Sequence, residues 1–136
     1  MTGLIASLLH RLDRLFPRPR VEGRESPRAY SEWEFRTGTA LLERYREHLG
    51  AIEGRRLLDI GCGLGGKTVV YSDAGAEVTG LDIDPAHCAA AVSYSAGKGC
   101  PADFVCGDAG DLPFPDGTFD LVVANDSMEH FPDPAA

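Results

Sequence analysis

A glycine-rich stretch at residues 61–68, GCGLGGKT, has the residue types and spacing of a ligand-binding loop. It fits G-x-x-x-x-G-K-[ST], in which backbone amides and a lysine hold a nucleoside triphosphate. It also fits G-x-G-x-x-G, in which glycines let the backbone approach a dinucleotide. A third spacing, G-x-G-x-G after an acidic residue, is present as well. The loop alone does not choose among these ligands.

Acidic side chains stand where such a loop would meet its ligand. Asp59 precedes the loop, and Asp82 and Asp108 each follow an apolar run farther along the chain. In an open parallel sheet, ligands bind beyond the carboxyl ends of the strands. If the apolar runs are neighbouring strands, the three carboxylates gather at one edge of the sheet, where they favour a cationic ligand.

The elements that must position these residues alternate between strands and helices. The predicted strands are 55–62, 77–84, 102–109 and 119–126, and the predicted helices between the first three are 66–76 and 85–99. Pro85 stands in the first turn of the second of these helices. Near-continuous apolar strands separated by helices are typical of a parallel sheet in an α/β domain. We therefore expect a Rossmann-like α/β fold.

The first 50 residues carry helical patterns only. Apolar residues recur at three- and four-residue spacing from Leu4 to Phe16, which predicts an amphipathic helix. It is expected to cover an apolar patch of the protein or of a partner, with a membrane-surface or substrate-gating role as the alternative. A second helix is expected near Ser31–Leu49, weakened by Gly38. The sequence thus predicts an N-terminal helical extension at 1–50 and an α/β ligand-binding domain at 51–136.

Charge separates the three candidate ligands, which are a nucleoside triphosphate, a dinucleotide and a cationic ligand for the third spacing. Residues 57–136 carry two lysines against thirteen acids, so the field of this segment does not attract polyanions. A triphosphate beside Asp59 would be repelled, at a cost of several kcal/mol unless a metal offsets it. Lys67 is the cation near the loop that helps. A nucleoside triphosphate is therefore disfavoured.

A dinucleotide explains the glycines, and it explains Asp82 as the acceptor for ribose hydroxyls. It also brings a pyrophosphate near Asp59 and leaves Asp108 without a role. S-adenosylmethionine accounts for every acid. Its sulfonium and ammonium groups are favoured by an acidic pocket, its ribose hydroxyls can donate to Asp82, and its adenine amine can donate to Asp108. An NAD-dependent oxidoreductase remains the enzymatic alternative.

Four motifs, in order and spacing, resemble those of class I S-adenosylmethionine-dependent methyltransferases. They are LLDIGCGLGG (57–66), VTGLDIDP (78–85), VCGDAGDLPFPDGTFDLVVAND (105–126) and MEHFPDP (128–134). The closest group looks like the broad one that contains ubiquinone- and menaquinone-pathway and other small-molecule methyltransferases. The match covers residues 55–134, and the ordered set is far more specific than the glycine loop.

The resemblance implies a set of cofactor-binding residues: Asp59, Gly61, Gly63, Gly65, Asp82, Ile83, Asp108, Ala109 and Asn125. Asp59 would orient the loop and reach the ligand's amino group, directly or through water, and the three glycines would line its methionine and ribose parts. Asp82 would hold the ribose, and Ile83 would pack on the adenine.

The resemblance also implies that Asp108 binds the adenine amine and that Ala109 flanks the adenine ring. The backbone near Asn125 would approach the methionine part. The implied reaction is attack of an acceptor atom on the methyl carbon, which proximity accelerates, and the sulfonium leaves without protonation. No His/Cys cluster has metal-ligand spacing, so no metal is expected.

A domain of this family would continue for three more strands beyond strand four. We expect a C-terminally truncated chain that holds the first four strands, with the acceptor pocket outside the sequence. Glu129 and His130 are weak candidates for a catalytic base. The predicted function is methyl transfer to an unidentified small-molecule acceptor, with a non-catalytic cofactor-binding or interaction remnant as the alternative.

Composition bounds the remaining expectations. With 136 residues, 43% of them hydrophobic, and a net charge of −8, the chain is expected to be one domain without nucleic-acid partners. No apolar run approaches a bilayer span and no signal peptide is recognisable, so a cytoplasmic location without stable membrane insertion is expected. The four cysteines form no C-x-x-C pair and are expected to be reduced. His87 is expected on a helix surface, and Cys62 as a small residue of the loop.

Overall fold

Four strands form one parallel sheet in the computed structural model, which describes residues 27–125, 127 and 128. They are β1 (Arg56–Ile60), β2 (Glu77–Asp82), β3 (Asp103–Cys106) and β4 (Leu121–Val123), in the spatial order β3-β2-β1-β4. The expected Rossmann-like α/β fold is confirmed. The predicted helix Leu4–Phe16 and the candidates Glu129 and His130 lie outside the described residues.

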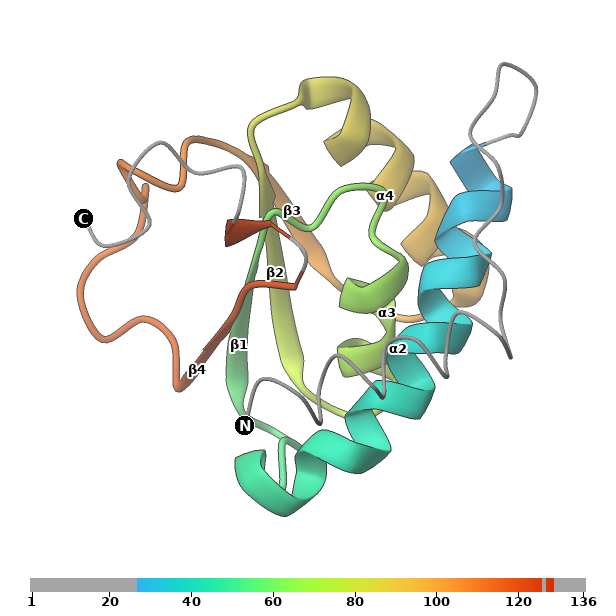
Figure 1. The fold of residues 1–136 in the computed structure, drawn as a ribbon. Helices are drawn as coiled ribbons and strands as arrows, with labels where there is room; N and C mark the ends of the chain where they lie inside the picture. Colours follow the sequence, from blue (N-terminus) through green and yellow to red (C-terminus); the bar gives the residue numbers. More distant parts are fainter. Residues whose placement is uncertain (1–26, 126, 129–136) are drawn as a thin grey trace.

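Three helices lie on one side of this sheet (Figure 1). They are α2 (Pro27–Leu49), α3 (Gly66–Asp73) and α4 (Pro85–Lys98). The α4 start follows from local chemistry, because Asp84 Oδ1 accepts the Ala86 N–H at 2.8 Å and Pro85 needs no hydrogen bond at the first position. This cap places the first turn of α4 beside the end of β2.

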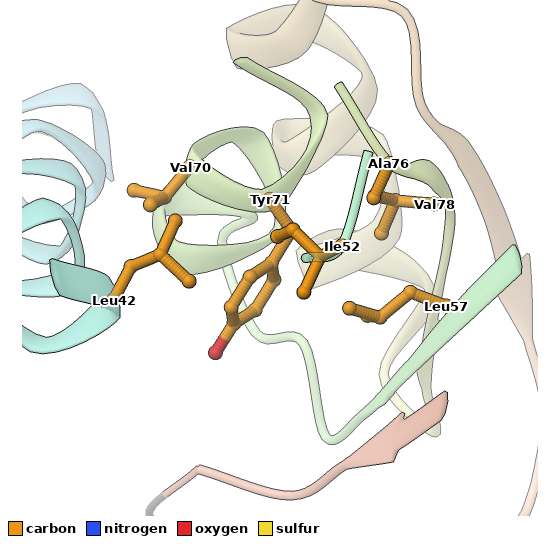
Figure 2. Packing of buried hydrophobic residues seen from close by; sticks show 7 residues of the cluster. All are labelled: Leu42, Ile52, Leu57, Val70, Tyr71, Ala76 and Val78. Carbon is orange, nitrogen blue, oxygen red and sulfur yellow. The ribbon is translucent and has the colours of Figure 1, made fainter. Parts of the chain in front are cut away.

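The hydrophobic core lies between the helices and the sheet (Figure 2). Its buried members come from α2, from the segment before β1, from β1 and β2, and from α3 and the turn after it: Leu42, Ile52, Leu57, Val70, Tyr71, Ala76 and Val78. Leu42 of α2 therefore shares one core with the sheet. Apolar burial of this kind contributes roughly 25 cal/mol per Å² and fixes where the strand ends lie.

Helix α2 begins four residues before the predicted Ser31 and runs through Gly38 without interruption. A Cβ added at Gly38 would lie 3.1 Å from Val70 Cγ2 of α3. The glycine that weakens the helix in the sequence therefore lets α2 lie close against α3. Ser31 Oγ then donates to Leu64 O at 3.0 Å, which ties α2 to the glycine loop.

Strand β4 is shorter than the predicted 119–126. Before it, Asp120 is held by Arg56, whose Nη2 lies 2.9 Å from Asp120 Oδ1, and the Arg56 guanidinium and N–H lower the pKa of Asp120 to about 2. β4 pairs with β1 as expected for the fourth strand, and Leu57 faces Leu121 in the register. Val122 is 58% exposed, so β4 is an edge strand among the described residues.

Candidate functional site

The carboxyl ends of β1, β2 and β3 meet at one edge of the sheet. The register pairs Ile60 with Leu81 and Asp82 with Cys106, so the residues after each strand are neighbours. The loop after β1 is joined to β2, because the Gly61 and Cys62 N–H groups both donate to Leu81 O, at 2.8 and 3.0 Å. This edge holds the candidate site.

Asp82 is the hydrogen-bonding centre of the edge. Its Oδ2 accepts the Gly63 N–H of the loop at 2.9 Å, and its Oδ1 accepts the Asp84 N–H at 2.9 Å. Its Oδ1 also lies 3.3 Å from His87 Nδ1. A carboxylate has roughly four acceptor positions, so three are in use and one remains for a ligand hydroxyl. Asp82 therefore shapes the loop and still has capacity for a ribose.

His87 lies on the helix surface, as expected, but its contacts extend further than the sequence suggested. Its side chain is 46% exposed, and its Nε2 lies 3.7 Å from Asp84 Oδ2. The signal was present in DIDPAH, where a helix that starts at Pro85 turns the third residue back toward both carboxylates. His87 therefore belongs to the edge of the candidate site.

Asp59 is buried beneath the loop rather than open to a ligand. It is 2% exposed, and Thr68 Oγ1 of α3 donates to its Oδ2 at 2.8 Å. Burial raises the pKa of the Asp59 carboxyl to about 6, against the opposing effects of the Thr68 hydrogen bond and the Lys67 charge. Of the two roles implied for Asp59, this geometry supports the orientation of the loop.

The raised pKa of Asp59 leads to a prediction about Asp59→Asn. The folded protein binds the carboxyl proton of Asp59 more tightly than the unfolded chain does. Ionisation therefore lowers the free energy of unfolding as the pH rises from 3.8, the ordinary pKa of this carboxyl, to its folded-state pKa of about 6. Asparagine keeps an acceptor for Thr68 and does not titrate. Relative to the wild type, the variant should gain about 3 kcal/mol in free energy of unfolding over that interval.

Urea unfolding at a series of pH values measures this difference. Asp116→Asn, at an exposed position, is the matched control and should follow the wild type at every pH. Parallel wild-type and Asp59→Asn curves would contradict a buried, raised carboxyl.

The three loop glycines differ in what surrounds them. A Cβ at Gly63, whose φ is +53°, would meet no atom within 4 Å. A Cβ at Gly65 would lie 2.8 Å from Ala91 Cβ of α4, and one at Gly61 would collide with Ser127. Gly63 therefore borders open space, whereas Gly65 and Gly61 are required by packing within the protein.

On the β3 side of the edge, apolar and acidic groups face outward. Ile83 is 70% exposed. Asp108 is also exposed and its Oδ1 accepts the Gly110 N–H at 2.8 Å, while Ala109 between them is half-buried. An exposed branched side chain offers a contact for an aromatic ring, and an exposed carboxylate after the neighbouring strand offers an acceptor for its amine.

On the β4 side, Asn125 turns its side chain inward. Its Nδ2 donates to the Tyr71 hydroxyl at 2.7 Å, and Ser127 Oγ donates to Ile60 O at 2.9 Å. These bonds hold the segment after β4 against the start of the glycine loop. Tyr71 and Ser127 carried no signal in the sequence, because each acts through a contact between distant segments.

Comparison with known proteins decides the family. A family model described as a methyltransferase domain matches residues 58–136. The chain belongs to this methyltransferase domain family. The resemblance to class I S-adenosylmethionine-dependent methyltransferases is thereby confirmed.

Two curated methyltransferases and one solved structure illustrate the match. A sterol 24-C-methyltransferase of Gibberella zeae is 38% identical over 76% of this chain and 28% of its own length. A ubiquinone biosynthesis O-methyltransferase of Bordetella avium is 33% identical over 68% of this chain and 39% of its own. The [4+2]-cyclase SpnF has a TM-score of 0.67 at 28% identity, over 98% of this chain and 51% of that one. The chain thus spans well under half the length of these curated relatives.

Other kinds of site can be checked in the described part of the methyltransferase domain. Cys62 of the loop is 5% exposed, and burial raises its pKa, so it is a packed thiol rather than a nucleophile. Within residues 27–125, 127 and 128, no cluster of three or more His, Cys, Asp or Glu residues could hold a metal ion. No helix in the same part of the chain is long and apolar enough to cross a membrane.

Proposed function

We propose that this chain supplies the S-adenosylmethionine-binding part of a methyltransferase that acts on a small molecule. The carrying observation is the contact between Asp82 and the Gly63 N–H, with open space beyond the Gly63 α-carbon. This contact places a carboxylate acceptor and a backbone without a side chain side by side. A ribose with an attached methionine group requires both features.

The described residues fit this cofactor. Gly63 lets the backbone approach it, the remaining acceptor position of Asp82 takes a ribose hydroxyl, and the exposed Ile83 packs on the adenine. Asp108 is proposed to accept from the adenine amine. The acids at this edge also attract the positive charges of the cofactor. When bound, S-adenosylmethionine supplies an electrophilic methyl group.

The chain's own contribution to methyl transfer is to bind and orient. Asn125 and Ser127 are anchored to Tyr71 and Ile60, so the segment after β4 is held in place beside the proposed methionine position. When the methyl group is held in line with an acceptor atom, much of the translational and rotational entropy is lost on binding, so the barrier of the reaction step is lower. Glu129 and His130 remain proposed candidates for a base.

The acceptor is proposed to be a small molecule because the relatives named above are sterol and ubiquinone-pathway methyltransferases. We also propose that the chain has no nucleic-acid partners, since the α/β part carries a large excess of acids. A cytoplasmic location is proposed because Cys62, Cys88, Cys100 and Cys106 are free thiols.

Calorimetry with four ligands tests the cofactor assignment. S-adenosylmethionine and its demethylated product should both bind the 136-residue chain, and more tightly than ATP or NAD. The acidic edge repels the phosphates of ATP and NAD, whereas it attracts the ammonium group of both sulfur ligands and the sulfonium of S-adenosylmethionine. NAD binding tighter than either sulfur ligand would instead support the oxidoreductase alternative, and ATP binding tighter would support a triphosphate loop.

A further inference from the structure

Two cysteine thiols flank the residues proposed to hold the cofactor. Cys106 is the last residue of β3 and faces Asp82 in the register, and Cys88 stands in the first turn of α4. Cys106 Sγ donates to Ile83 O at 3.5 Å. Cys88 Sγ lies 3.6 Å from Asp82 O and 3.7 Å from Val105 O. Both thiols therefore touch the backbone of the adenine and ribose side of the site.

Cys88 Sγ lies 3.7 Å from the carbonyl oxygen of Val105, the residue before Cys106. Cys106 Sγ in turn contacts the carbonyl oxygen of Ile83, the residue after Asp82. The two thiols are therefore neighbours on the same two backbone segments, 82–83 and 105–106. They come from different elements, yet α4 begins directly after β2 and so returns its first turn to the end of β3. Their exposure is unequal, since Cys106 is exposed whereas Cys88 is 8% exposed. This arrangement has one thiol that a reagent can reach and a second thiol behind it.

We propose that Cys88 and Cys106 form a reversible disulfide that lowers the affinity of the neighbouring cofactor site. The formation of the bond rests on the position of both thiols against the backbone segments 82–83 and 105–106. Its effect on affinity rests on the proposed function, because it acts through Asp82 and Ile83.

The bond forms by thiol–disulfide exchange with a small disulfide such as oxidised glutathione. The Cys106 thiolate attacks one sulfur of that disulfide, forms a mixed disulfide and releases one glutathione thiolate. Cys88 then gives up its proton and attacks Cys106 Sγ, which expels the second glutathione. Two protein thiols are oxidised, one small disulfide is reduced to two thiols, and a reductant reverses both steps.

Order of attack follows from burial. Burial raises the pKa of the Cys88 thiol, and the neighbouring Cys106 raises it further, so Cys88 is a poor first nucleophile. Cys106 is exposed and meets the reagent first. Cys88 needs only to reach a sulfur that already lies beside it.

Oxidation changes the backbone that holds the cofactor. The S–H groups that contact Ile83 O and Asp82 O are lost, and the first turn of α4 becomes tied to the end of β3. His87, which contacts Asp82, precedes Cys88 on the same turn. Shifts at these positions move the ribose and adenine contacts together, so we expect about a tenfold loss of affinity, typical of one weakened hydrogen bond.

Cys100 provides the matched control. It is a partly exposed thiol near the other end of α4, where its Sγ lies 3.7 Å from Asp73 Oδ1 and from Lys98 O. The Cys100→Ser chain should therefore oxidise like the wild type. It also simplifies the assignment, because trypsin then leaves Cys88 alone in peptide 68–98 and Cys106 alone in peptide 99–136.

The experiment incubates the 136-residue Cys100→Ser chain with oxidised glutathione, followed by mass spectrometry and by calorimetry with the demethylated cofactor product. We expect peptides 68–98 and 99–136 to be joined with loss of two hydrogens. Joining should be absent in Cys100→Ser chains that also carry Cys88→Ser or Cys106→Ser. Affinity should fall about tenfold on oxidation and return with a reductant.

The outcomes separate this proposal from the proposed function. A mixed disulfide that persists on Cys106, or no reaction at either thiol, would overturn the disulfide whatever the cofactor. A joined pair with unchanged affinity would overturn its regulatory effect. If the reduced chain bound no S-adenosylmethionine or product, the proposed function and the effect on affinity would both fail, while the mass measurement would still decide on the bond.

Discussion

Asp82→Ala is expected to weaken binding of S-adenosylmethionine by about 10- to 100-fold. A hydrogen bond to a charged group contributes about 1.5 to 3 kcal/mol, and the variant loses the acceptor proposed for the ribose. It also releases the Gly63 N–H, which Asp82 Oδ2 holds at 2.9 Å, so the loop loses its fixed position. Both effects reduce affinity, and calorimetry measures their sum.

The two effects are separated by changing the ligand. The wild type should prefer the demethylated product over an analogue that lacks ribose hydroxyls, and Asp82→Ala should lose that preference. Asp111→Ala removes the same charge from an exposed position on a neighbouring loop and should leave affinity within about twofold, as expected for a screened charge. A preference that survives in Asp82→Ala would show that Asp82 shapes the loop without touching the ribose.

The strand and helix pattern was predictable because each element repeats a local rule. Pro85 marks the start of α4 in the sequence, and the structure adds the cap by Asp84, which the sequence pattern assigns to the preceding strand. Alternating apolar runs and glycines likewise predicted four parallel strands. What the pattern could not give was the length of the strands, since β3 and β4 are both shorter than the predicted 102–109 and 119–126. Just before β4, Asp120 is held by Arg56, a contact between residues that are distant in the chain.

The site was predictable as a set of positions and less so as a set of contacts. The resemblance implied contact with the ligand for Asp59 as well as for Asp82, whereas Asp59 is buried against Thr68 and Asp82 lies at the edge. Lys67, which the sequence analysis considered only for a phosphate, is 8% exposed. Its charge partly offsets the burial that raises the pKa of Asp59. These distinctions depend on depth below the surface, which residue spacing does not encode.

The two glycines Gly63 and Gly65 are expected to separate binding from folding. Gly65→Ala places a Cβ 2.8 Å from Ala91 Cβ and 3.0 Å from Ala91 Cα, and a φ of +80° adds strain. Because the helix backbone cannot move aside as a flexible side chain would, overpacking costs about 1 to 3 kcal/mol and the left-handed conformation about 1 to 2 kcal/mol. Urea unfolding should therefore show a loss of about 2 to 5 kcal/mol.

Gly63→Ala adds the same methyl group, but it should reduce cofactor affinity and leave most of the stability unchanged. Its φ of +53° costs about 1 kcal/mol, and no atom lies within 4 Å of the new Cβ, so most of the stability is kept. That methyl group enters the space proposed for the cofactor, and affinity should fall at least tenfold, as for the loss of one well-made contact.

A double variant checks the cause of the instability at Gly65. Ala91→Gly removes the Cβ that a new Gly65 side chain would meet, so the double change should cost less than the sum of the two single changes. Strict additivity would assign the loss to backbone strain alone. If Gly63→Ala bound the cofactor as tightly as the wild type, the open space beside this glycine would not be the cofactor site, and the ribose and methionine would have to lie elsewhere along the sheet edge.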